Sequence, residues 1–111
     1  MLFQARQGDV LVQQVPNRRR TGRSVSERGR VILAHGELTG HAHEVIAAVP
    51  DVDDHPAAQI FEEPDGARFL FVERACLLIH EEHRPIAVPP GCFRVITQRE
   101  YRPEGIRDVL D

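Results

Sequence analysis

The chain has 111 residues, of which 41% are hydrophobic and 28% are charged, and its formal net charge is -3. This length fits one domain with its own core, and the composition excludes a disordered or disulfide-dense chain. No apolar run approaches the roughly 20 residues that span a bilayer. Residues 1–10 lack the apolar stretch of a signal peptide. We therefore expect a single cytoplasmic domain over residues 1–111 that has no membrane partner.

Short apolar stretches alternate with Pro and Gly turn signals along the chain. The expected strands cover residues 8–15, 30–35, 41–49, 59–63, 68–73, 75–79, 85–88 and 92–98. Pro64-Asp65-Gly66 predicts a hairpin, and Pro89-Pro90-Gly91 predicts a second turn. Many short strands at close spacing are typical of an all-β barrel or sandwich. Residues 103–111 form a tail for which we expect a short C-terminal helical turn.

All 14 basic residues are arginines, and six of them form one basic stretch around a predicted loop over residues 17–29: Arg18, Arg19, Arg20, Arg23, Arg28 and Arg30. Such a cluster has two interpretations. It is suited to contact phosphate, or it is a solvated loop without a partner. The net negative charge argues against a nucleic-acid partner, so we favour the solvated loop.

His41 and His43 carry the strongest chemical signal in the sequence. In a strand, a His-x-His pair has both imidazoles on one face. Two such imidazoles repel each other when protonated, so the arrangement is costly unless they bind a shared partner. The usual shared partner is a divalent metal. His80 and His83 follow an apolar run, and their spacing suits a tight turn or one helical turn. We expect the four histidines to lie together as metal ligands; alternatively, they are turn histidines without chemistry.

Imidazole ligands suit Zn, Fe, Ni, Cu or Mn, and the sequence does not choose among these divalent ions. Cys76 and Cys92 lie in apolar segments and are expected to be buried reduced thiols, so a thiolate zinc site is not expected. Four carboxylates near the histidines are candidates to orient the imidazoles, bind metal or act as a base: Glu37, Glu44, Glu81 and Glu82. His35 and His55 are expected to have no chemical role.

The His41-Ala42-His43 pair, followed by a β segment and by Pro89-Pro90-Gly91, resembles a small cupin. Cupins hold a metal inside a β-barrel with a His-x-His pair, a Glu four or five residues later and a further His. Here Ala47 and Ala48 stand at the Glu positions, and the later histidines precede the Pro-Pro-Gly turn. The resemblance therefore implies a metal-binding β-barrel whose ligand set differs from that of cupins.

The whole chain also resembles a group of small uncharacterised bacterial and phage-associated proteins, a likeness that brings no activity with it. The shared look lies in short segments: Gly8-Asp9-Val10-Leu11, residues 36–43, His80-Glu81-Glu82-His83 with Pro85-Ile86, Pro89-Pro90-Gly91 and Gln98-Arg99-Glu100-Tyr101. The last of these reads either as a contact for a partner or second subunit, or as a charged edge strand that discourages pairing. We favour the edge strand.

These observations lead to one hypothesis and two alternatives. The hypothesis is a cupin-like β-barrel with a histidine metal site, open to a small-molecule substrate, whose catalytic residues are unknown and whose status as an enzyme is undecided. The first alternative is a non-enzymatic β module that self-assembles, for example as a homo-oligomer, or binds a partner, with structural histidines. The weaker alternative is a nucleic-acid accessory protein that uses the arginines between residues 18 and 30.

Overall fold

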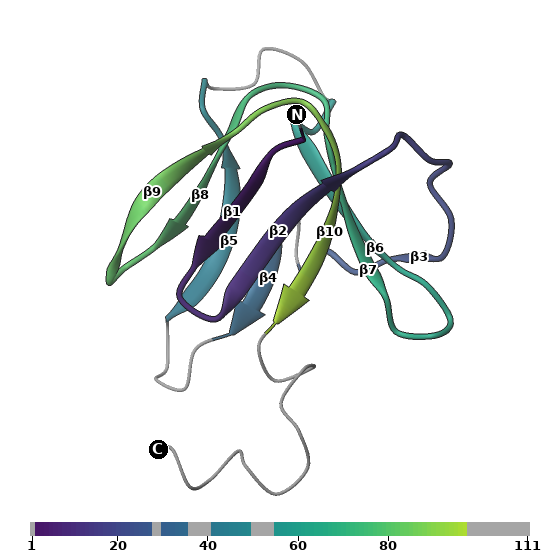
Figure 1. Cartoon of the computed structure of the whole chain (residues 1–111), viewed down its shortest axis with the longest axis horizontal. Coiled ribbons are helices and arrows are strands. Elements are labelled where there is room, and N and C mark those ends of the chain that lie inside the picture. The colour runs from purple at the N-terminus through teal and green to yellow at the C-terminus, as the bar shows by residue number, and fades with distance from the viewer. Residues whose placement is uncertain (1, 28–29, 36–40, 50–54, 98–111) are drawn as a thin grey trace, which may run out of the picture.

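Ten antiparallel strands make up the regular structure in the computed structural model, which describes residues 2–27, 30–35, 41–49 and 55–97 (Figure 1). In chain order they are β1 (Gln4–Gln7), β2 (Val10–Val15), β3 (Arg23–Ser24), β4 (Val31–His35), β5 (Ala42–Ala47), β6 (Ala58–Glu62), β7 (Arg68–Val72), β8 (Cys76–His80), β9 (His83–Val88) and β10 (Gly91–Thr97). The described residues contain no helix.

The strands form two sheets that pack on one core. The larger sheet has the order β1-β2-β10-β7-β6-β3, and the smaller has the order β4-β5-β8-β9. In Figure 1 the smaller sheet lies behind and beside β1 and β2, so the two sheets form two layers. The edge strands β1 and β9 approach each other, yet the sheets are not joined into a closed barrel.

Alternation along the strands explains why these residues form a two-layer core. In β2, Val10 and Val12 point inward and are fully buried, whereas Leu11 and Gln13 point to the outer face. The largest buried side chains come from both sheets: Phe93, Leu33, Ile60, Leu70 and Leu78. Burial of such a side chain contributes about 1.5–3 kcal/mol, so this shared interior is the main source of stability.

The outer face of the larger sheet carries a second apolar cluster, and part of the β2–β3 connection covers it. Phe69, Phe71 and Cys92 are buried there. The arginine loop, which we define as residues 16–22, places the guanidinium carbon of Arg18 3.8 Å from the centroid of the Phe69 ring. The corresponding distance from Arg20 to the Phe71 ring is 5.2 Å. The arginine loop is therefore a cover for this sheet face.

The all-β expectation is confirmed, and the expected closed barrel is not found because both sheets keep free edges. Gly8 and Asp9, expected to begin a strand, instead form the turn between β1 and β2, and β1 itself was not predicted. The helical turn expected in residues 103–111 and the segment 98–101 lie outside the described residues.

Both cysteines behave as expected from the sequence. Cys76 and Cys92 are buried and form no disulfide with each other. Burial raises the pKa of the Cys92 thiol, against a smaller opposing effect of Arg18. Within the described residues, no helix has the length and apolar character needed to cross a membrane.

Candidate functional site

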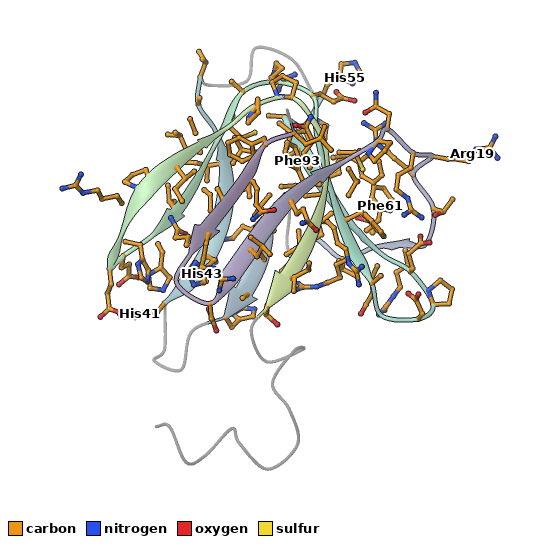
Figure 2. The ribbon with its side chains drawn as sticks, viewed as in Figure 1. Arg19, His41, His43, His55, Phe61 and Phe93 are labelled. Carbon is orange, nitrogen blue, oxygen red and sulfur yellow. The ribbon has the colours of Figure 1, made fainter. Side chains whose placement is uncertain are left out.

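The four predicted ligands gather at one end of the molecule, near the β8–β9 turn and the β1–β2 turn. His41 and His43 lie at the start of β5, and His80 and His83 flank the two-residue turn between β8 and β9. His80 and His83 are directly opposite each other in the β8–β9 register, which is the tight-turn arrangement among those expected. Figure 2 places His41 and His43 together near this end, far from Arg19. We call these four histidines with Asp9 the histidine corner.

Three imidazole rings form a triangle in the histidine corner. The ring centroids of His43 and His80 are 4.3 Å apart, and those of His80 and His83 are 4.9 Å apart. The third side, from His43 to His83, measures 5.8 Å. The His41 ring lies at the margin, 5.9 Å from that of His80. The four rings therefore lie together, as expected from the sequence, whereas their role as metal ligands stays a prediction.

His43 is the buried member of the corner, with 4% of its surface exposed. Its Nδ1 is 2.9 Å from Oε1 of Gln7, and its Nε2 is 3.5 Å from Oδ1 of Asp9. Burial and the neighbouring His80 lower the pKa of His43 from its ordinary value of 6.5, against the opposing effect of Asp9. The side chain is therefore held as a neutral imidazole, the form that binds metal.

Gln7 joins the two sheets at this corner. Its side chain, on a residue 2% exposed, donates from Nε2 to the carbonyl oxygens of Leu78 and Arg84, at 3.0 and 2.9 Å. These acceptors belong to β8 and β9, whereas Gln7 ends β1. The same amide thus holds three strands together and contacts His43.

Gly8 lies against two of the imidazoles. Its φ is +59°, in the left-handed region that favours glycine. A Cβ at this position would stand 2.9 Å from Nε2 of His83 and 3.4 Å from Nε2 of His43. Nε2 of His83 and the Cε1–Nε2 edge of the His43 ring therefore both lie beside the Gly8-Asp9 turn, and a residue larger than glycine would crowd them.

The two carboxylates of the β8–β9 turn relate differently to the histidines. Oε2 of Glu81 is 3.2 Å from Nε2 of His41, so this carboxylate contacts the outermost imidazole. The contact of Glu82 is through its backbone, because its N–H donates to Nδ1 of His80 at 3.1 Å. In neutral His80 the proton therefore resides on Nε2.

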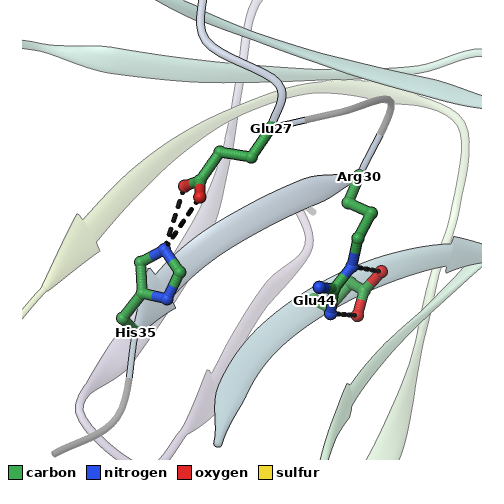
Figure 3. A network of polar contacts seen from close by, with 4 residues as sticks. All are labelled: Glu27, Arg30, His35 and Glu44. Atoms are coloured by element: carbon green, nitrogen blue, oxygen red, sulfur yellow. Dashed lines mark hydrogen bonds and ion pairs between the residues drawn. The ribbon is translucent and has the colours of Figure 1, made fainter. Parts of the chain in front are cut away.

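The candidate Glu44 and the strand histidine His35 have partners outside the corner, Arg30 and Glu27, as Figure 3 shows. Glu44 accepts from both Nε and Nη2 of Arg30, at 3.1 and 2.7 Å, and this bond raises the pKa of Arg30. His35 lies on β4, with Nε2 3.0 Å from Oε2 of Glu27. Glu44 directly follows the inward-facing His43 on β5, so strand alternation places its side chain on the opposite face of the sheet. Glu37 lies outside the described residues.

His55 and the arginines of the arginine loop also lie apart from the corner. Figure 2 places His55 at the opposite end of the view from His41. Arg18 and Arg20 pair with Glu63 and Glu73, at 3.2 and 2.9 Å. These contacts give the arginine loop a structural role; Arg28, at the far end of the basic stretch, lies outside the described residues.

The side chains of the corner converge without forming a finished coordination shell. Among the described residues, no group of three or more His, Cys, Asp or Glu side chains is placed to hold a metal ion as it stands. One reason is visible at His80, whose Nδ1 is taken by the Glu82 N–H and whose Nε2 carries the proton. Closure of a shell around an ion requires this ring to turn.

Sequence reasoning missed Gln7, Gly8 and Asp9 as parts of the site. All three lie more than thirty residues from His43 in sequence and were assigned to a strand start or to no element. The signal that was available is the Gly-Asp pair, because such pairs mark turns and this one stands beside an apolar strand. The β1–β2 turn reaches the histidines because β1 pairs with β2 and also approaches β9.

Comparison with known proteins identifies a family. The family described as Domain of unknown function (DUF8820) matches residues 6–98, so the chain belongs to it. This match includes the β1–β2 turn and all four histidines of the corner. The searches of curated proteins and of solved structures gave no significant match.

Proposed function

Since the family brings no activity with it, we propose that this protein binds one divalent transition-metal ion in the histidine corner. The proposed ligands are Nε2 of His43 and of His83 with the carboxylate of Asp9, and His80 joins them once its ring turns. His41 and Glu81 stand at the margin as a further imidazole and a proton acceptor. The single observation that supports the proposal most is that Nε2 of His43 and Nε2 of His83 both lie beside Gly8, with Oδ1 of Asp9 3.5 Å from Nε2 of His43.

The distances between rings fit a shared ion. Two imidazoles bound to one tetrahedral ion at about 2.0–2.1 Å hold their ring centroids roughly 5 Å apart. The three sides of the triangle, 4.3, 4.9 and 5.8 Å, bracket this separation. The 3.5 Å between Nε2 of His43 and Oδ1 of Asp9 is close to the roughly 3.4 Å that separates a nitrogen and an oxygen on one such ion.

The charge balance also favours a cation. His43 has a lowered pKa and so resists the proton that would otherwise link it to Asp9. A metal ion satisfies the facing nitrogen and oxygen together without protonating the imidazole. Asp9 has half of its side chain exposed, so one side of the ion would face solvent and accept water or a small substrate. When bound, the ion would supply Lewis-acid or metal-water chemistry there.

The proposed site keeps part of the cupin resemblance and departs from the rest. The His-x-His pair leads into β5 as the resemblance implies. The carboxylate comes instead from the β1–β2 turn, and the later histidines come from the β8–β9 turn. The proposal is accordingly a metal site built on two open sheets.

Metal analysis of protein purified without a His-tag tests the proposal. After removal of metal by a chelator and dialysis against Zn²⁺, the wild type should retain one ion per chain. At a hundredfold excess over Kd, binding to the native state alone adds about 2.7 kcal/mol of stability, which raises the thermal midpoint by about 10 °C. Both effects should be lost in His83→Ala and in His43→Ala.

His35→Ala is the matched control, because His35 lies on the neighbouring strand β4 and pairs with Glu27, which is outside the corner. This variant should bind zinc like the wild type. His83 is exposed, so His83→Ala should remain folded even if the loss of the buried His43 destabilises the chain. A wild type that takes up no metal would contradict the proposal and favour the alternative of a β module with structural histidines.

A further inference from the structure

We propose that Gln7 is a positioning residue that fixes the tautomer of His43, with the proton on Nδ1 and the lone pair on Nε2. The tautomer follows from the contacts of Gln7 alone. Its consequence for metal affinity rests on the proposed function.

The orientation of the Gln7 amide is set by its two other partners. The carbonyl oxygens of Leu78 and Arg84 can only accept hydrogen bonds, so the amide group that faces both must be the NH2 group. The amide oxygen is then the atom 2.9 Å from Nδ1 of His43. An inverted amide would oppose two carbonyl oxygens with a third oxygen in a buried site, which is unfavourable.

An amide oxygen is an acceptor only, and this decides where the proton of the neutral imidazole resides. Nδ1 of His43 must donate to Oε1 of Gln7, so Nε2 carries the lone pair. Nε2, which carries that lone pair, is 3.5 Å from Oδ1 of the Asp9 carboxylate and lies beside Gly8, as does Nε2 of His83. Two facing acceptors repel each other unless a cation lies between them.

The choice of glutamine has a chemical consequence. A hydrogen bond from the second ring nitrogen orients a metal-binding imidazole and increases its basicity. A carboxylate in place of the amide would also accept this bond, and its negative charge would favour the imidazolium form. The neutral amide orients the ring without that charge, and its two donated bonds fix its own position on β8 and β9.

Nuclear magnetic resonance of the metal-free protein tests the inference directly. Long-range ¹H–¹⁵N spectra of the histidine rings at about pH 8, where imidazoles are neutral, distinguish the two tautomers. We expect His43 of the wild type to be in the Nδ1–H form. Gln7→Leu removes the acceptor and should yield a mixture of both tautomers or the Nε2–H form.

Gln14→Leu is the matched control, because Gln14 on β2 also makes a side-chain bond to the backbone, from Phe3 N–H to its Oε1, at a place outside the histidine corner. This variant should keep the wild-type tautomer. In zinc titrations, Gln7→Leu should bind about 10–100-fold more weakly than wild type, and Gln14→Leu should be unchanged.

A wild-type His43 protonated on Nε2 would overturn the inference, whatever the variants do. A folded Gln7→Leu protein that keeps only the Nδ1–H form would also overturn it. If the tautomer is as expected and the wild type binds no zinc, the positioning role stands and the proposed function fails. The two claims are thus separated by one set of samples.

Discussion

The histidine corner and the arginine loop are both clusters of basic side chains, but their neighbours differ. In the arginine loop, Arg18 and Arg20 each have a carboxylate within 3.2 Å and an aromatic ring beneath the guanidinium. In the histidine corner, three imidazoles face one another, and Asp9 is the carboxylate beside the buried one. The charges of Arg18 and Arg20 are thus each balanced by a carboxylate. In the histidine corner, by contrast, Nε2 of His43 and Oδ1 of Asp9 face each other at 3.5 Å.

This difference separates a structural cluster from a candidate binding site. An arginine that pairs with a carboxylate and packs on an aromatic ring already has its charge balanced within the protein, so it is not free to bind an external phosphate. A buried imidazole with a lowered pKa, as at His43, that faces a carboxylate is costly without a shared partner. The experiments below test whether the two clusters respond independently.

The largest expected effect comes from filling the space at Gly8. In Gly8→Ala the new Cβ would stand 2.9 Å from Nε2 of His83, which blocks the approach of an ion. We expect zinc affinity to fall about 100-fold or more, with a loss of about 1 kcal/mol in stability from the left-handed backbone. Isothermal titration and urea unfolding measure the two effects separately.

Gly66→Ala is the matched control for backbone strain. Gly66 also has a positive φ, of +92°, but a Cβ there would meet nothing within 4 Å. It should lose a similar amount of stability and bind zinc normally. Equal zinc affinities in Gly8→Ala and Gly66→Ala would show that the space beside Gly8 is not the metal position.

A smaller effect is expected at the arginine loop, and only on stability. Arg18→Ala removes the guanidinium that covers Phe69 and pairs with Glu63. The cation–π contact and the exposed ion pair together are worth about 1 kcal/mol, so urea unfolding should shift by that amount. Arg19→Ala should have no effect on stability, because Arg19 extends away from the fold in Figure 2.

Zinc affinity should be unchanged in both arginine variants. A fall in zinc affinity in Arg18→Ala would mean that the two clusters are coupled, which would break the comparison. Salt-sensitive binding of single-stranded DNA by the wild type, lost in Arg19→Ala, would instead favour the phosphate interpretation of the basic stretch.

The smallest effect is the pH dependence of the metal-free protein. The pKa of His43 is lowered from its ordinary value of 6.5 in the folded state. As pH falls below about 6.5, the unfolded chain binds a proton at His43 before the native state does, so the free energy of unfolding should decrease. Urea unfolding in chelator at about pH 7.5 and about pH 5.5 measures the change.

His43→Asn should reduce this pH dependence, and Arg18→Ala should retain it in full. Stability that rises on acidification in the wild type, and does so through His43, would contradict the lowered pKa. The pair of variants therefore assigns the effect to one cluster.

The fold class could be predicted because it depends on local patterns. Alternation in residues 10–15 and the Pro64-Asp65-Gly66 turn are local signals, and both reappear as β2 and as the β6–β7 connection. Whether sheets close into a barrel depends on pairing between distant strands. The sequence pattern does not record that β1 and β9 remain separate edges.

The candidate site divides in the same way. The grouping of His80 and His83 could be predicted because the turn between them is local, and His41 with His43 follows from strand alternation. Gln7 and Asp9 could not be assigned, because their contact with His43 requires the two sheets to meet at one corner. Glu44 was a reasonable candidate by sequence distance, but its position beside the inward-facing His43 turns it to Arg30.

The central claim, that imidazoles from two turns and Asp9 share one ion, is tested most directly by titration with Co²⁺. The visible spectrum of bound Co²⁺ reports the number and the kind of its ligands. We predict that metal-free wild type binds one Co²⁺ per chain with a spectrum typical of nitrogen and oxygen ligands, altered in Asp9→Asn and abolished in His83→Ala. Saturating Co²⁺ that leaves the spectrum of hydrated Co²⁺ unchanged would contradict the claim.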